Sequence, residues 1–199
     1  MTISRWSRRG LLGFGLAAGP AAFLPRHPRA ATPSLQLTPA CADADEVTPA
    51  QTEGPYFTPN SPERGNLVAD GIDGTRIALV GFALDPQCRP IAGALVDLWH
   101  ANAAGVYDNQ GYRLRGHQFT DAGGRYVFET IVPGLYPGRT RHFHVKVQPP
   151  GGAVLTTQLY FRGEPGNERD RIFDKALLMD IRSAEGSEIG RFDFVVARG

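Results

Sequence analysis

The chain has 199 residues, which is the length of one domain or of two small ones. It contains 24 Gly and 16 Pro while hydrophobic residues reach 42%, a composition that excludes disorder and collagen and favours a turn-rich packed domain. Residues 1–31 hold five Arg and no acidic residue, so without those five positive charges the net charge would change from +1 to −4. The remaining chain therefore has no basic excess, which argues against nucleic acid or an anionic membrane as a partner.

The first residues predict a targeting signal. Arg8 and Arg9 directly precede the apolar run from Leu11 to Leu24, which is too short and too rich in Gly and Pro to cross a bilayer or to form a basic amphipathic surface helix. The pattern favours a twin-arginine export signal over residues 1–31. We therefore expect a periplasmic or extracellular protein without a stable membrane anchor. Such signals are similar to those of proteins exported already folded, often with a cofactor, and this first hints at a metal.

Two cysteines, Cys41 and Cys88, follow the predicted signal. Neither belongs to a Cys-x-x-Cys pair and neither adjoins a histidine, so zinc binding and thiol redox chemistry have little support. An oxidising destination favours a structural disulfide between them. This bond would hold the N-terminal part of the chain against the body of the domain.

The rest of the chain predicts an all-β fold. Residues 32–62 lack a sustained period and are expected to form an extended N-terminal arm, and residues 63–199 are expected to form one mainly antiparallel β-sandwich domain with short helical insertions. One short stretch, 170–179, has a helical pattern. Runs rich in β-branched and aromatic residues, separated by Gly, Pro and Asp turn signals, predict strands at 77–83, 94–101, 126–131, 142–147, 154–161 and 192–196.

The strongest chemical signal is the pair His142 and His144. Successive side chains of a strand point to opposite faces, so the two imidazoles share one face while Phe143 and Val145 share the other. The apolar face is expected to pack in the core, which leaves the histidines toward a cavity or water. This His-x-His pattern, just after a Tyr-Pro-Gly-Arg segment, favours metal binding over a purely structural pair.

The histidines alone do not identify the ion, because neutral imidazole suits zinc, copper, iron and nickel. No Asp or Glu lies within a few residues of the pair, which weakens the case for a site with two histidines and one carboxylate, although a distant carboxylate could complete one. A tyrosine could bind as tyrosinate if the metal were a strong Lewis acid such as trivalent iron. The candidates are Tyr56, Tyr107, Tyr112, Tyr126, Tyr136 and Tyr160.

Four motifs taken together resemble the intradiol ring-cleavage dioxygenases, and among them the protocatechuate 3,4-dioxygenase type in its small exported single-chain form. They are TEGPYF at 52–57, GALVDLWHAN at 93–102, RGHQFTD at 115–121 and TQLYF at 157–161. The resemblance covers nearly the whole chain after the predicted signal. It implies a mononuclear non-haem Fe(III) centre, one per chain, held by two tyrosinates and two histidines.

Matched position by position, the resemblance gives Tyr107 and His142 as equatorial ligands and Tyr136 and His144 as axial ones. Tyr107 lies in the Gly-x-Tyr context that follows the Trp-x-Ala-Asn segment, and Tyr136 precedes the His-x-His pair. Tyr112 is a rival to Tyr107, but its spacing from Trp99 fits the family less well. Tyr136 is also a catalytic residue by this resemblance, since the ligand that substrate displaces could accept a catechol proton.

The resemblance also implies a substrate pocket. Arg139 matches the arginine that stabilises carbanion character on the substrate ring, and Gln158 matches the polar residue beside it. Trp99 corresponds to a pocket-wall aromatic, with a packing tryptophan as the alternative, and Tyr56 is expected at the pocket entrance. Arg141 is a candidate partner for a carboxylated substrate ring. His100 and His117 are expected to be hydrogen-bonded structural residues.

The implied activity is oxidative cleavage of a catechol-type ring by O2 between its two hydroxylated carbons, which gives a cis,cis-muconate-type product. Two other classes stay open. The segment 79–98 also resembles the paired strands of transthyretin-like domains, which would make the chain a non-catalytic binding module. A copper or zinc enzyme could use His142 and His144 alone. The sequence leaves the particular catechol and assembly into a homo-oligomer open.

Overall fold

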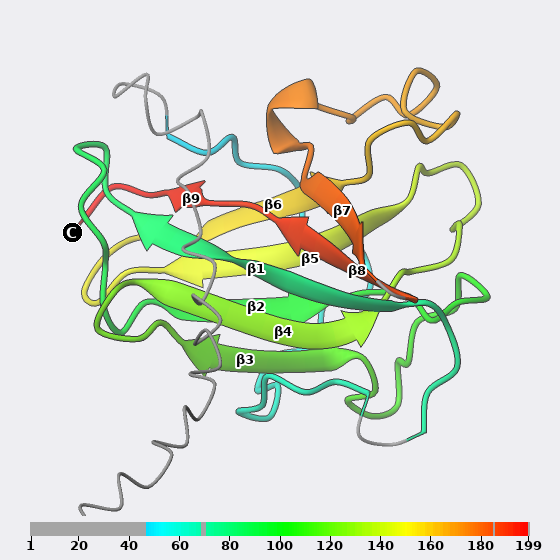
Figure 1. Ribbon diagram of the computed structural model, residues 1–199, viewed down its shortest axis with the longest axis horizontal. Helices are drawn as coiled ribbons and strands as arrows, with labels where there is room; N and C mark the ends of the chain where they lie inside the picture. The colour runs from blue at the N-terminus through cyan, green and yellow to red at the C-terminus, as the bar shows by residue number, and fades with distance from the viewer. Residues whose placement is uncertain (1–46, 69–70, 185, 199) are drawn as a thin grey trace, which may run out of the picture. The chain divides into compact units, whose positions relative to one another are not determined.

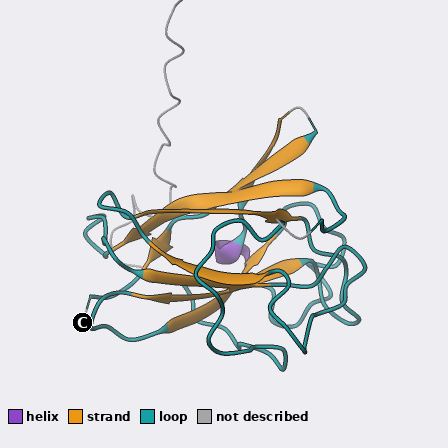
Figure 2. Cartoon of the chain, turned by 90° about the horizontal axis from the view of Figure 1, so that it is seen from below, coloured by secondary structure: helices purple, strands orange, loops and turns teal. Residues whose placement is uncertain are grey.

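In the computed structural model two β-sheets pack face to face (Figures 1 and 2). The structure describes residues 47–68, 71–184 and 186–198. The predicted β-sandwich is confirmed, and antiparallel pairs predominate, with two parallel pairs as exceptions. Within these described ranges no helix is long and apolar enough to cross a membrane.

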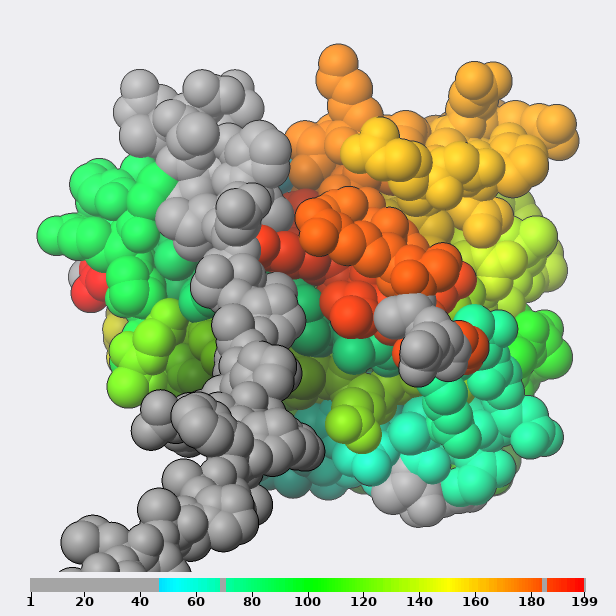
Figure 3. All heavy atoms as spheres, viewed as in Figure 1, coloured from blue at the N-terminus to red at the C-terminus, as the bar shows by residue number. Residues whose placement is uncertain are grey.

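The first sheet has the strand order β4-β1-β8-β7, and the short strand β9 also pairs with β1. β1 is antiparallel to β4 and parallel to β8 and β9. The segments that form β7 and β8 lie on the surface of the face seen in Figure 3, where they are coloured orange to red. The strands are β1 (Arg76–Leu84), β4 (Arg125–Ile131), β7 (Asp180–Ala184), β8 (Ser187–Arg191) and β9 (Phe194–Val195).

The second sheet has the order β3-β2-β5-β6, and all its pairs are antiparallel. Its outer face carries the candidate site. The side chain of Gln118 links β3 to β4 of the other sheet, because it accepts from the backbone N–H of Val127 and donates to the carbonyl of the same residue. The strands are β2 (Leu95–Trp99), β3 (Arg115–Phe119), β5 (His142–Gln148) and β6 (Leu155–Tyr160).

The core lies between the sheets, and β5 shows how the sequence divides its two faces. Phe143, Val145 and Val147 are fully buried in the main hydrophobic cluster, where they meet residues of β1 and β4 such as Leu79 and Phe128. The alternate residues of β5 point out of this core. Strand alternation, read from the sequence, thus separates the packing face from the histidine face.

Five of the six predicted strands match β1, β2, β4, β5 and β6 to within two residues at each end, and the sixth is reduced to the two residues of β9. The predicted helix over 170–179 is wrong: only Lys175–Leu177 forms a 3-10 turn, η2, capped by Asp174. The extended backbone that follows pairs with β6, because the N–H of Met179 donates to the carbonyl of Tyr160. Strands β3, β7 and β8 were not predicted from the sequence.

Residues 47–62 run as an extended segment without strands of their own and contact both sheets. The N–H of Thr48 donates to Val195 of the first sheet, and the N–H of Gln51 donates to Thr156 of the second. The predicted signal (1–31), the earlier part of the predicted arm (32–46) and Cys41 lie outside the described residues. Pairing of Cys41 with Cys88 therefore stays a prediction.

Candidate metal centre and substrate pocket

One row of side chains crosses all four strands of the second sheet. The pairing register places Arg115 of β3 opposite Trp99 of β2, Trp99 opposite His144 of β5, and His144 opposite Gln158 of β6. Each of the four is at most 3% exposed. They belong to strands that other residues anchor in the core, so the row is a buried, rigid floor for a site on the outer face of the sheet.

The two histidines of β5 converge on this floor. His142 Nε2 and His144 Nε2 are 3.1 Å apart, and His142 Nδ1 lies 2.6 Å from the carbonyl of Thr140. A carbonyl can only accept, so Nδ1 of His142 carries the proton and its Nε2 presents a lone pair. Burial lowers the pKa of His142 to about 4 and also moves the pKa of His144 well below its usual value. Both rings are therefore neutral at pH 7, the form that binds metals.

Trp99 fixes the ring plane of His144. The two rings stack with centroids 5.0 Å apart and planes 9° from parallel. His144 Nδ1 is buried without a hydrogen-bond partner in the described part of the chain, so stacking and the strand hold this ring in place. Trp99 thus packs against the centre, and its role in the wall of a substrate pocket stays a prediction.

Tyr107 reaches the histidines from the loop between β2 and β3. Its hydroxyl lies 3.5 Å from His142 Nε2, and the residue is 8% exposed. Burial raises the pKa of the Tyr107 phenol far above its ordinary value. Ionisation at neutral pH therefore requires a strong Lewis acid nearby, which a trivalent metal ion would provide. Tyr112, the rival candidate, instead donates to the carbonyl of Pro59.

Tyr136 and Tyr56 complete an aromatic cluster beside Tyr107. The Tyr136 ring meets Tyr107 edge to face at 6.1 Å, and its hydroxyl is 2.9 Å from that of Tyr56. Tyr56 in turn stacks on Tyr107 with ring centroids 4.5 Å apart. The hydrogen bond to Tyr136 raises the pKa of Tyr56. The four predicted ligands thus gather in one place, with Tyr56 between the two tyrosines.

These residues suit a trivalent ion better than a divalent one. Two nitrogen ligands at right angles, each about 2.1 Å from one ion, are about 3 Å apart, and the two Nε2 atoms have that spacing. No group of three or more His, Cys, Asp or Glu side chains able to hold a metal occurs in the ranges that the structure describes. A metal here would therefore depend on the tyrosines, and phenolate oxygen is a ligand for Fe(III).

Arg139 points inward rather than over the Pro-Gly turn. Its Nε donates to Asp170 at 2.8 Å, and Nη2 donates to Gln158 Oε1 at 2.6 Å. The amide nitrogen of Gln158 donates to the carbonyl of Thr52. The guanidinium is thus joined to the row of the sheet on one side and to a buried carboxylate on the other, while its side chain stays 19% exposed.

The segment 52–57 forms a wall over the histidines. Gly54 has φ +70°, and an added Cβ would lie 3.3 Å from Cε1 of His144. Glu53 pairs with Lys146 at 2.8 Å, and the Lys146 ammonium lies over the ring of Phe57. These contacts hold the segment on the outer face of the second sheet, where it shields the centre from water.

The remaining candidates lie apart from the centre. His100 is within hydrogen-bonding distance of Ala101 and Thr130, and His117 of Ser61, so both have the structural contacts expected of them. Arg141, suggested as a partner for a carboxylated ring, has its guanidinium engaged by Glu164 and by the carbonyl of Pro133.

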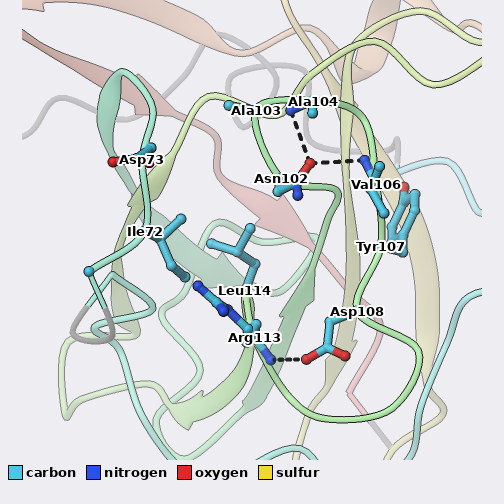
Figure 4. Close-up of a pocket in the computed structure, with 11 residues that line it drawn as sticks. Ile72, Asp73, Asn102, Ala103, Ala104, Val106, Tyr107, Asp108, Arg113 and Leu114 are labelled. Carbon is cyan, nitrogen blue, oxygen red and sulfur yellow. Dashed lines mark hydrogen bonds between the residues drawn. The ribbon is translucent and has the colours of Figure 1, made fainter.

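A cavity of about 500 Å³ opens beside the loop that carries Tyr107 (Figure 4). Of the site residues predicted from the sequence, only Tyr107 lines it. Its polar groups are occupied locally: Asn102 Oδ1 accepts from the N–H groups of Ala104 and Val106, and Asp108 accepts from that of Arg113. The cavity therefore does not coincide with the predicted substrate pocket.

Sequence reasoning missed three contributors to the site. Asp170 accepts from Arg139 and from the N–H of Thr140, although it lies 31 residues from Arg139 in sequence. Tyr160, interpreted as a packing residue, is buried but also places its hydroxyl 2.7 Å from Gln51 and 3.5 Å from Arg139. Arg115 is fully buried on β3. Arg115 and Tyr160 belong to the motifs at 115–121 and 157–161, and Asp170 begins the stretch that was interpreted as helical, but none of these patterns indicates the contact that the side chain makes.

Comparison with known proteins agrees with this geometry. A family described as Dioxygenase matches residues 52–195, which include every ligand candidate. Catechol 1,2-dioxygenase 2 of Acinetobacter lwoffii is 30% identical over 186 residues, covering 79% of this chain and 68% of the relative. The chain belongs to the intradiol ring-cleavage dioxygenase family. Its β-sandwich is the fold that solved structures of that family share.

Two further relatives differ in how much of each chain they share. The protocatechuate 3,4-dioxygenase beta chain of Burkholderia cepacia is 37% identical over 118 residues, half of either chain. The dioxygenase domain of a dioxygenase carbohydrate-binding protein fusion from the cellulolytic bacterium Streptomyces sp. SirexAA-E is 52% identical, with a TM-score of 0.76, and covers 77% of this chain and all of that domain. The chain thus spans between half and about two thirds of these two curated relatives but the whole of this solved domain.

Proposed function

We propose that this dioxygenase uses one Fe(III) per chain to cleave catechol-type rings between the two hydroxylated carbons. The convergence of His142 Nε2, His144 Nε2 and the Tyr107 hydroxyl supports this proposal most directly. Tyr136, beside Tyr107, would supply the fourth protein ligand. The reaction joins both atoms of O2 to the ring carbons, so a catechol and O2 give a cis,cis-muconate-type diacid without another reductant.

The bound ion would supply Lewis acidity, which ionises the tyrosines and polarises the catechol toward O2. Tyr136 would accept a proton from the incoming catechol at its hydroxyl oxygen. Tyr56 already contacts that oxygen at 2.9 Å, and so can hold the neutral Tyr136 phenol by a hydrogen bond. The partly exposed pair of Tyr136 and Tyr56 would therefore accept and hold the substrate proton, while the buried Tyr107 would stay bound to the metal.

Arg139 would stabilise negative charge as it develops on the ring. Asp170 and Gln158 hold its guanidinium in place before substrate arrives, so little reorganisation is needed when the charge appears. The wall formed by residues 52–57 excludes water, which strengthens this electrostatic interaction. The chain thus contributes orientation, a proton acceptor and a fixed cation.

The proposal predicts an iron protein with a tyrosinate-to-iron absorption band in the visible region. His142→Ala and His144→Ala are each expected to lose most of the iron, because within the described residues no third His, Cys, Asp or Glu joins them that could replace an imidazole nitrogen. His117→Ala is the matched control and should keep its iron, since His117 contacts Ser61 instead. Iron per chain, the visible spectrum and incorporation of both ¹⁸O atoms from ¹⁸O2 into the product are measured. A colourless protein that cannot be loaded with iron would contradict the proposal and favour a copper or zinc site or a binding module.

For the substrate we propose catechols from the environment, because the predicted signal would place the enzyme in the periplasm or outside the cell. The Streptomyces relative, a fusion with a carbohydrate-binding protein, comes from a cellulolytic bacterium, which favours plant-derived aromatics. Oxygen uptake with catechol, protocatechuate, hydroxyquinol and alkylated catechols would rank the candidates. Replacing Arg8 and Arg9 by lysine tests the export proposal, and the enzyme should then stay in the cytoplasm.

A further inference from the structure

The loop that carries Tyr107 is held on both sides of this residue. Before it, Asn102 Oδ1 accepts from the backbone N–H groups of Ala104 and Val106. After it, the Asp108 carboxylate accepts from three backbone N–H groups of the same loop, those of Gln110, Gly111 and Arg113. Figure 4 shows the bond from Arg113. These bonds fix the shape of the loop but do not join it to the sheet.

Arg115 provides a connection between this loop and the sheet. Its Nε and Nη2 both donate to the backbone carbonyl of Asp108, at 3.0 and 2.8 Å, and Asp108 directly follows Tyr107. Arg115 lies on β3, at one end of the buried row, and pairs with Trp99 of β2. The peptide next to the Tyr107 ligand is therefore held by two hydrogen bonds from the floor of the centre.

Stability alone does not explain this arginine, because burying a charged guanidinium costs free energy that hydrogen bonds to one carbonyl offset only in part. The residue is 1% exposed, and within the described ranges no carboxylate forms an ion pair with it and Nη1 has no hydrogen-bond partner. A buried charge in such surroundings is often no better for stability than an apolar residue of similar volume. Its fixed fork of donors, however, defines the position of one carbonyl closely.

We infer that Arg115 is a positioning residue for the Tyr107 ligand. By holding the Asp108 carbonyl it sets the distance and angle at which the Tyr107 oxygen meets the metal. Arg139 binds Gln158 at the opposite end of the same row, so a guanidinium lies at each end of the floor. Arg139 stabilises charge on the substrate ring, and Arg115 positions the metal ligand Tyr107. The inference rests on the proposed function, because it requires a metal bound by Tyr107.

The test uses two backgrounds that each keep one tyrosinate. In Tyr136→Phe the remaining absorption band comes from Tyr107, and in Tyr107→Phe it comes from Tyr136. Arg115→Met, which has similar length but no charge or donors, is added to each, and the spectrum is recorded per bound iron at saturating iron. Arg113→Met is the control, because it makes the same change on an exposed residue two positions away.

We expect Arg115→Met to shift the band or lower its intensity at least about twofold in the Tyr136→Phe background and to leave it unchanged in Tyr107→Phe. Release of iron to a chelator from the otherwise unaltered protein should become about 10-fold faster. Arg115→Lys, which can still donate to the Asp108 carbonyl, should recover part of both properties, and it replaces Arg115→Met if that variant fails to fold. Arg113→Met should change neither.

Equal changes in both backgrounds would mean that Arg115 supports the domain in general, and this would overturn the inference. An unchanged band in the Tyr136→Phe background would overturn it as well. In both cases the unaltered protein would still bind iron, so the proposed function would stand. A protein that binds no iron at all would overturn the proposed function and this inference together.

Discussion

At the scale of single residues, the most informative side chain is Arg139, which forms hydrogen bonds with Asp170 and Gln158. We expect Arg139→Ala to keep iron and colour but to lose turnover by about 100-fold or more, because one preorganised charge contributes a few kcal/mol to the transition state. Arg139→Lys should also lose turnover, since it keeps the charge without the planar fork. Stopped-flow kinetics and anaerobic substrate binding separate the two effects. Near-normal turnover in Arg139→Ala would remove this residue from the mechanism.

A second prediction concerns His100, which burial holds at a pKa of about 4. An unfolded histidine titrates near 6.5, so between these values the unfolded chain binds the additional proton. The free energy of unfolding should therefore fall as the pH falls from about 6.5 toward 4, by at most about 1.4 kcal/mol per pH unit for this one residue. Urea unfolding of metal-free protein at pH 6 and pH 5 measures the slope. His100→Gln should make it shallower, and an unchanged slope would contradict the assigned pKa.

At the scale of elements, the extended segment 52–57 has a close contact with the centre at Gly54. Gly54→Ala introduces strain at φ +70° and places a methyl group 3.3 Å from His144 Cε1. Gly151→Ala is the matched control, because its φ is +71° and no atom lies within 4 Å of the added carbon. Both should lose about 1 to 2 kcal/mol of stability. Only Gly54→Ala should also release iron faster to a chelator. Equal rates of iron release in the two variants would show that the segment 52–57 does not affect the metal centre.

The elements also show where sequence reasoning succeeds. The alternation along β5 is a local property, and it correctly predicted that His142 and His144 share a face opposite Phe143. The helix expected over 170–179 fails because Asp170 binds Thr140 and Arg139 and because Met179 pairs with β6, contacts that no local pattern contains. Strand β3 was missed because its sequence, Arg-Gly-His-Gln-Phe, contains no β-branched residue and begins with a charged one.

The candidate site divides in the same way. The predicted ligand set came from motifs whose members lie within short stretches of chain. In the structure Tyr107 lies beside both histidines and Tyr136 lies beside Tyr107, while binding of a metal by the four stays a prediction. The partners that orient them come from distant segments: Tyr56 bonds Tyr136 across 80 positions, and Gln158 bonds the carbonyl of Thr52 across 106. Such pairs depend on the register of the sheet and the path of residues 47–62. Single-sequence patterns carry no information about either.

At the scale of the whole molecule, the predicted disulfide would close a long loop. If Cys41 and Cys88 are joined, the bond should contribute about 3 to 4 kcal/mol by restricting the unfolded chain. Cys41→Ser and Cys88→Ser should then lower the melting temperature equally, and the double variant should lose nothing further. Thiol titration of the native protein is the complementary measurement. Two free thiols would contradict the pairing.

The floor of the centre makes the enzyme intolerant of changes in chain length at particular places. Arg115, Trp99, His144 and Gln158 come from four different strands and meet only when all three strand pairings are in register. Inserting or deleting one residue within any of these strands would move the side chain that the strand supplies to the row onto the opposite face of the sheet, toward the core. The same change in the hairpin after β5 would leave the row intact. Differences in chain length among natural homologues should therefore occur in the loops that join β2, β3, β5 and β6. The positions at which insertions are tolerated would show where the part of each strand that forms the floor ends.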